Sequence, residues 1–222
     1  MKIEKIFVIN LPHRQDRKRE SILEFESIGN YDYEFIDAVN WNDLSTDYLE
    51  DCVTRDYKYK TKDKRAQYGN VACGLSHLKI YDYILNNYGK DGDKAFIVLE
   101  DDFHIENTHT FMNKVNEALT ITNDWNIIYL GGLKNTNGDK RESFLPGFEK
   151  AISVWNSHAY IIKNDPEWIA AMKECGKRGY YADRALRKVA RDDKANAHRY
   201  LITWPYEVLQ RKSYSDINHV VR

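Results

Sequence analysis

Runs of apolar residues separated by charged segments predict an alternation of strands and helices along the chain. Residues 6–9 and 96–99 are each four consecutive apolar residues, as expected for strands that are buried on both faces. Further strands are expected at residues 33–39, 127–130, 151–155, 159–162 and 201–204. This alternation predicts an α/β fold in which helices flank a mixed, mostly parallel sheet.

Between these runs, apolar residues recur every three or four positions, which is the spacing of an amphipathic helix. The spacing predicts helices at residues 16–28, 43–51, 71–88 and 111–119. Another helix should begin after Asp165, an N-cap aspartate that Pro166 follows, and a last one near Asp183. No repeat or linker interrupts the pattern, so we expect one domain over residues 1–222.

Two segments lack this periodicity. Residues 57–65 are strongly basic, which favours a surface loop or a lid over an anionic substrate. Residues 133–150 are polar and predict a long loop of the kind that often has a function.

Composition narrows the class of protein. Among 222 residues, 42% are apolar, which is enough for a sizeable core. Lysine plus arginine (33) almost balances aspartate plus glutamate (34), so a general nucleic-acid binder is disfavoured. Three cysteines without short spacing indicate neither a disulfide framework nor a zinc site, and they favour a reducing compartment.

The N-terminal residues carry charge where a signal peptide would need an apolar segment. No window approaches the roughly 18–20 apolar residues of a membrane span. We therefore expect a soluble protein with a cytoplasmic localisation.

Three adjacent carboxylates, Glu100, Asp101 and Asp102, follow the apolar run at residues 96–99. Such groups repel one another unless a cation lies among them. Oxygen ligands of this kind suit Mg²⁺ or Mn²⁺, which commonly bridge the phosphates of a substrate. The alternative is a strand that ends in a solvated acidic turn.

Other polar residues lie where strands end or helices begin. Arg14 and Arg17 follow the first predicted strand and could bind an anion, or they could form a solvated first helical turn. Ser76 and His77 are expected in the first two turns of their helix, where a histidine more often orients its neighbours than binds a ligand. Asp183 could be a catalytic carboxylate or an N-cap.

Familiar phosphate-binding and nucleophile motifs are missing. The chain contains no G-x-x-x-x-G-K-[ST], no G-x-G-x-x-G and no G-x-S-x-G. The acidic motif, the arginine-bearing loop and the later carboxylate instead suit a nucleotide-diphosphate donor with a separate general base.

Seven short motifs, in order, resemble glycosyltransferase family 25, which holds bacterial lipooligosaccharide galactosyltransferases and collagen galactosyltransferase domains. They spread over nearly the whole chain, and Asn70 departs from the carboxylate expected at its position. The matching stretches are residues 8–11 with Arg14, Asp16 and Arg17, residues 69–78, residues 98–102, Asp124 with residues 129–131, Ala159 with Tyr160, Asp183, and Gln210 with residues 215–217.

The resemblance implies a GT-A type fold, an inverting mechanism and a UDP-sugar donor, most often UDP-galactose. Glu100 and Asp102 would bind Mn²⁺ (or Mg²⁺), His219 is a candidate third ligand from the tail, and Asp183 is our hypothesis for the general base. The residues expected to bind the nucleotide-sugar are Asn10, Leu11, Arg14, Arg17, Ser76, His77 and Asp101.

The acceptor would be a glycan, a lipooligosaccharide or a collagen-like hydroxylysine, and we expect residues 57–67 and 133–150 to select it. Two other classes of protein use similar acidic and basic residues. A metal-dependent phosphoesterase or nuclease would cleave without an acceptor, and a non-catalytic sugar-binding protein would turn nothing over.

Overall fold

The computed structural model describes residues 1–29, 31–55, 63–89, 92–121, 124–134, 143–178 and 180–211. Within them, an eight-stranded sheet has the order β2-β1-β3-β8-β5-β9-β7-β6, and β10 pairs with β4 in a separate small sheet. The strands are β1 (Lys2–Asn10), β2 (Tyr33–Asp37), β3 (Lys94–Glu100), β4 (Phe103–Ile105), β5 (Ile127–Lys134), β6 (Ser143–Leu145), β7 (Phe148–Lys150), β8 (Val154–Lys163), β9 (Tyr200–Thr203) and β10 (Val208–Gln210).

The large sheet is mixed and mostly parallel. Strand β1 is parallel to both β2 and β3, and β5 is parallel to β9. Strands β8 and β7 are antiparallel to their neighbours and therefore run opposite to the other six. The predicted α/β class is confirmed.

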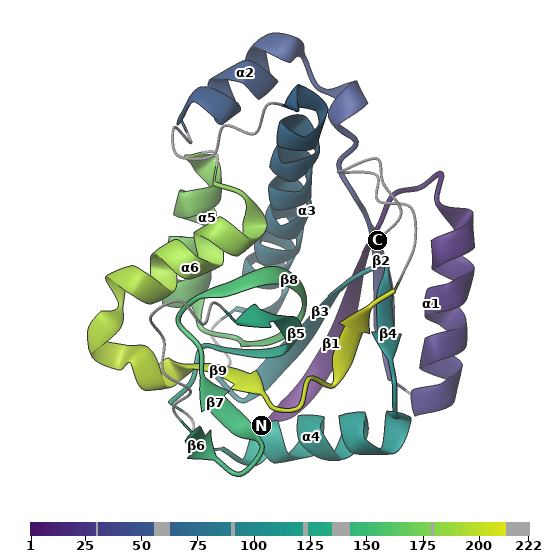
Figure 1. The fold of residues 1–222 in the computed structure, drawn as a ribbon, viewed down its shortest axis with the longest axis vertical. Coiled ribbons are helices and arrows are strands. Elements are labelled where there is room, and N and C mark those ends of the chain that lie inside the picture. Colours follow the sequence, from purple (N-terminus) through teal and green to yellow (C-terminus); the bar gives the residue numbers. More distant parts are fainter. Residues whose placement is uncertain are drawn as a thin grey trace.

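Helices cover both faces of this sheet (Figure 1). One face packs against α3 (Lys64–Tyr88), α5 (Pro166–Lys177) and α6 (Ala182–Asp192), and the other against α1 (Gln15–Ile28) and α4 (Thr108–Thr120). Helix α2 (Thr46–Arg55) packs on α3, and two short 3₁₀ helices span Trp41–Asp43 and Lys194–Arg199. None of these described helices is long and apolar enough to cross a membrane.

The register of β1 and β3 brings the predicted polar groups together. Ile9 is paired with Glu100, so the end of β1 and the acidic motif meet at one edge of the sheet. Ligands of open α/β sheets bind beyond the carboxyl ends of strands, as here.

Helix α3 begins earlier than the periodicity predicts. Asp63 accepts hydrogen bonds from the backbone N–H groups of Arg65 and Ala66 and caps a 25-residue helix. Ser76 and His77 therefore lie in its middle rather than in its first two turns. The apolar stripe is interrupted near the start by Gly69 and Gly74, which are buried but carry no apolar side chain.

The predicted long loop at residues 133–150 is partly regular structure. Strand β5 continues to Lys134, and residues 143–150 form the hairpin of β6 and β7. The last two residues of the apolar run at 151–155 and the whole run at 159–162 lie in one strand, β8, which contains Asn156 at a φ of 52°. Residues 56–62 and 135–142 lie outside the described residues, as does most of the expected lid.

Candidate active site

A cavity of about 250 Å³ lies at the carboxyl ends of β1 and β3. Its walls come from the loop after β1, residues 38–42, α3, the acidic motif, the start of α6 and the end of β10. Glu100, Asp101, Asp102 and Asp183 all line it. Four carboxylates from two distant parts of the sequence thus face one space.

Asp101 is held by two residues of the opening motif. The Arg17 guanidinium lies 2.6 Å from Asp101 Oδ1, and Asn10 donates a hydrogen bond of 2.7 Å to Oδ2. Burial raises the pKa of Asp101, although Arg17 acts in the opposite direction. This buried pair fixes the start of α1 against the end of β3.

The two carboxylate oxygens of Asp102 differ in their hydrogen bonding. Gln210 donates a 3.1 Å hydrogen bond to its Oδ2, whereas Oδ1 is buried and makes no hydrogen bond within the described part of the chain. Burial, followed by the neighbouring charge of Glu100, raises the pKa of Asp102 to about 6. A buried carboxylate oxygen without a hydrogen-bond donor can serve as a ligand to a cation.

Glu100 faces α3. Its Oε1 lies 3.5 Å from His77 Nε2 and 3.7 Å from Cys73 Sγ. Burial acts to raise the pKa of Glu100, but the neighbouring His77, followed by His158 and Cys73, leaves this pKa below its ordinary value. Glu100 is therefore an anion beside a histidine and a thiol.

Ser76 and His77 connect the helix to its surroundings. Ser76 Oγ accepts a 2.8 Å hydrogen bond from the backbone N–H of Val39 and donates one to the Ala72 carbonyl. His77 Nδ1 lies 2.7 Å from Tyr160 Oη. Ser76 thus fixes the wall at residues 38–42, and His77 lies beneath the cavity.

Asp183 lies in the first turn of α6, where Tyr181 rather than Asp183 occupies the N-cap position. Burial raises the pKa of Asp183, while Arg187 and backbone hydrogen bonds act to lower it. Gly74 permits this placement, because a Cβ there would lie 3.1 Å from the Tyr180 carbonyl just before α6. A carboxylate with a raised pKa is a stronger base.

The structure thus brings most of the predicted site residues together. Those that line the cavity are Leu11, Arg17, Ser76, Glu100, Asp101, Asp102 and Asp183. Asn10 and His77 do not line the cavity, but they contact two residues that do, Asp101 and Glu100 respectively. Arg14 forms an ion pair with Asp16 and is not among the lining residues, and His219 lies outside the described residues.

Sequence reasoning gave no role to several residues of the site. Cys73 and Asn156 line the cavity, and so does Trp41 from the segment after β2. The one local signal was that Cys73 precedes His77 by four positions, which places both side chains on one face of a helix.

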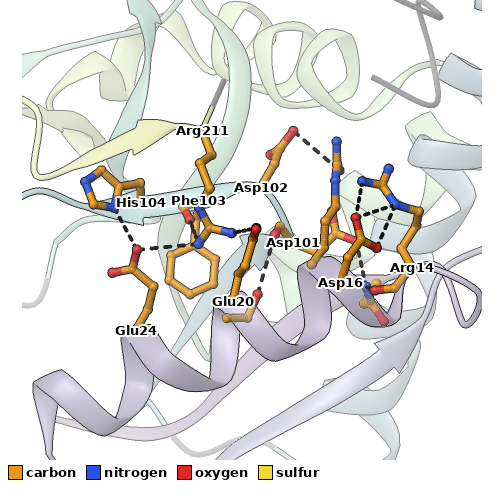
Figure 2. A network of polar contacts seen from close by, with 12 residues as sticks. Arg14, Asp16, Glu20, Glu24, Asp101, Asp102, Phe103, His104 and Arg211 are labelled. Atoms are coloured by element: carbon orange, nitrogen blue, oxygen red, sulfur yellow. Dashed lines mark hydrogen bonds and ion pairs between the residues drawn. The ribbon is translucent and has the colours of Figure 1, made fainter. Parts of the chain in front are cut away.

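A second polar network connects the end of β10 to the acidic motif (Figure 2). The backbone N–H of Arg211 donates to the Asp102 carbonyl, and its guanidinium donates a 2.7 Å hydrogen bond to the Phe103 carbonyl. The same guanidinium forms ion pairs with Glu20 and Glu24 of α1. These contacts place Gln210 beside Asp102.

Comparison of the sequence with known proteins identifies a protein family that this chain matches. The model described as "Glycosyltransferase family 25 (LPS biosynthesis protein)" matches residues 3–190. Procollagen galactosyltransferase 1-A of Xenopus laevis is 28% identical over 160 residues, which are 68% of this chain and 25% of that protein. A glycosyltransferase 25 family member of Aedes aegypti is 27% identical over 71% of this chain and 26% of its own length. The chain spans about a quarter of these relatives.

Solved structures resemble the chain only loosely. A glycosyltransferase involved in glycosylation of the major capsid of PBCV-1 matches with 10% identity and a TM-score of 0.45, over 90% of this chain and 92% of that one. Mouse xyloside xylosyltransferase 1 matches with 10% identity and a TM-score of 0.38, over 88% of this chain and 70% of that one.

Proposed function

Since the chain belongs to glycosyltransferase family 25, we propose that it transfers galactose from UDP-galactose to a hydroxyl group, as a single GT-A type domain with an inverting mechanism. The observation that carries the proposal is the shared cavity, in which Glu100 and Asp102 after β3 and Asp183 of α6 face one space. A donor diphosphate and an acceptor hydroxyl must meet in just such a space.

The acidic motif fits the metal that this donor chemistry requires. Glu100 and Asp102 offer carboxylate oxygens, and Asp102 Oδ1 is buried without a hydrogen bond. These hard ligands suit Mn²⁺ or Mg²⁺. When bound, such an ion neutralises charge on the diphosphate and on the departing UDP.

Asp183 is proposed as the general base. In an inverting transfer, a base removes the proton of the acceptor hydroxyl while its oxygen attacks the anomeric carbon on the face opposite UDP. Burial raises the pKa of Asp183, which strengthens it for this role.

The acceptor is proposed to be a glycan or a collagen-like hydroxylysine. The family description names lipopolysaccharide biosynthesis, and the Xenopus relative is named for procollagen. We propose a cytoplasmic localisation, because all three cysteines are thiols rather than members of a disulfide.

Binding of UDP in the presence and absence of Mn²⁺, measured by isothermal titration calorimetry, tests the donor assignment. We expect Mn²⁺-dependent UDP binding by the wild-type protein, its loss in Asp102→Asn, and its retention in Asp47→Asn, whose aspartate is exposed on α2. A phosphoesterase would bind other phosphate esters as well as UDP. Absence of UDP binding by the wild-type protein would reject the assignment.

A further inference from the structure

We propose that Cys73, His77 and Glu100 form a second cation site, which binds a borderline divalent ion of the Zn²⁺ type. One ligand atom from each side chain lies within 4.8 Å of the other two. The inference stands on these three residues and does not depend on the transferase reaction. Glu100 is common to this ligand set and to the set proposed for Mn²⁺.

The observed separations match the edges of a zinc coordination tetrahedron. Ligand atoms at the usual distances of about 2.0–2.3 Å from Zn²⁺ lie about 3.3–3.8 Å from one another. Glu100 Oε1 is 3.5 Å from His77 Nε2 and 3.7 Å from Cys73 Sγ. Two of the three edges therefore need no rearrangement of the protein.

Secondary structure holds the ligands in this arrangement. Cys73 and His77 are four residues apart on α3, so their side chains emerge one turn apart on one face. Glu100 is the last residue of β3, a strand whose residues 95–99 are all buried. Rigid elements rather than loops thus supply every ligand.

A second observation, at His77, also points to a cation ligand. Its side chain is buried (1% exposed), and Nε2, the atom that faces Glu100, makes no hydrogen bond within the described part of the chain. Its other ring nitrogen lies 2.7 Å from Tyr160 Oη, which lies 2.9 Å from Tyr81 Oη. Metal-binding histidines almost always use their second nitrogen in such a bond, which orients the ring.

The donor set selects the ion. A thiolate, an imidazole and one carboxylate suit Zn²⁺, whereas Mg²⁺ and Mn²⁺ prefer oxygen ligands alone. Binding converts the Cys73 thiol to a thiolate, and its proton is released to solvent. Because Cys73 lines the cavity, an ion can enter from it and keep a water molecule as fourth ligand. Cysteine spacing gave no indication of such a site, because histidine and glutamate take the place of further cysteines in this ligand set.

Cobalt substitution tests the site directly. Co²⁺ added to the metal-free wild-type protein should give the sulfur-to-cobalt charge-transfer band of a thiolate ligand. Cys73→Ser should lose this band, and Cys175→Ser should keep it, because Cys175 lies on α5 and is not one of the three clustered ligands. No band in the wild-type protein, or a band that survives in Cys73→Ser, would overturn the proposal.

A second measurement needs no variant. Zn²⁺ at about ten times its Kd should slow alkylation of Cys73 by iodoacetamide about tenfold in the wild-type protein. Mg²⁺ should not slow it, and the half-buried Cys175 serves as internal control in the same mass spectrum. An alkylation rate of Cys73 that Zn²⁺ leaves unchanged would overturn the site.

Asp102→Asn should keep the cobalt band even if it loses UDP binding, so the two proposals can fail separately.

Discussion

At the scale of single residues, the two arginines of the opening motif have different surroundings. Arg17 is buried and pairs with Asp101, and its guanidinium also lies 3.6 Å from Asp102 Oδ2. Arg14 pairs with Asp16, whose side chain is exposed. Arg17 is therefore the arginine that compensates the buried carboxylates.

Replacing Arg17 by alanine should destabilise the fold. The change leaves Asp101 buried beside Asp102 without its cation, which typically costs about 3–5 kcal/mol. Arg19→Ala, on the exposed side of the same helix, should change the free energy of unfolding by less than about 0.5 kcal/mol. Urea denaturation of both variants measures their free energies of unfolding. Equal stability of the two variants would show that the pair does not support the fold.

The raised pKa of Asp102 predicts how stability depends on pH in the metal-free protein. Because the folded-state pKa of about 6 exceeds the ordinary value of about 4, the folded protein binds this proton more tightly. The resulting stabilisation is complete below about pH 4 and is lost as the pH rises through about 6.

Asp102→Asn removes this titration. In the presence of a chelator, its Tm should exceed that of the wild-type protein at about pH 7.5 by more than at about pH 4.5. The difference between a pKa of about 6 and the ordinary value of about 4 corresponds to at most about 3 kcal/mol. A difference in Tm that stays constant over this range would contradict a raised pKa of Asp102.

Asp183→Asn separates catalysis from donor binding. Loss of the general base should lower the rate of transfer about 100-fold or more, while UDP and Mn²⁺ still bind. The matched control is Asp192→Asn, at the exposed end of the same helix. Near-normal transfer by Asp183→Asn would reject its role as base.

At the scale of elements, close packing around Gly131 of β5 places β10. A Cβ at this position would lie 2.3 Å from the Val208 carbonyl oxygen and 2.6 Å from His158 Nε2. His158 itself lies 3.3 Å from the same carbonyl oxygen. The glycine therefore lets β10 approach β5 and carry Gln210 to Asp102.

Gly131→Ala should destabilise the protein by about 1–3 kcal/mol, because backbone atoms must move to admit the methyl group. Gly92→Ala is the control, since among the described residues its added Cβ would meet the end of the Lys163 side chain alone, at 3.8 Å. Thermal unfolding of both variants tests the prediction. A stable Gly131→Ala variant would show that β10 can shift without cost.

Elements were predictable where their apolar pattern is continuous. The runs at residues 6–9 and 96–99 lie within β1 and β3, and Asp165 caps α5 as expected. The start of α3 was not predictable, because the buried positions of its first turns are not held by large apolar residues. They are held by Ala66, Gln67 and Gly69. Strand β10 is three residues long and carries too little pattern to recognise.

At the scale of the whole molecule, the order of the seven motifs and their resemblance to family 25 predicted that the acidic motif and Asp183 contribute to one site. Parallel strands β1 and β3 end at one edge of the sheet, which explains why the opening motif meets Asp101. The pairing of Glu100 with Cys73 and His77 was not predictable, because it depends on how α3 packs over the sheet.

Release of UDP from a panel of UDP-sugars, with Mn²⁺ or with a chelator and without acceptor, tests the central claim most directly. We predict slow release from UDP-galactose that requires Mn²⁺ and is lost in Asp102→Ala. Release from no nucleotide-sugar, together with no effect of UDP and Mn²⁺ on Tm, would contradict the assignment of this cavity as a UDP-sugar transferase site.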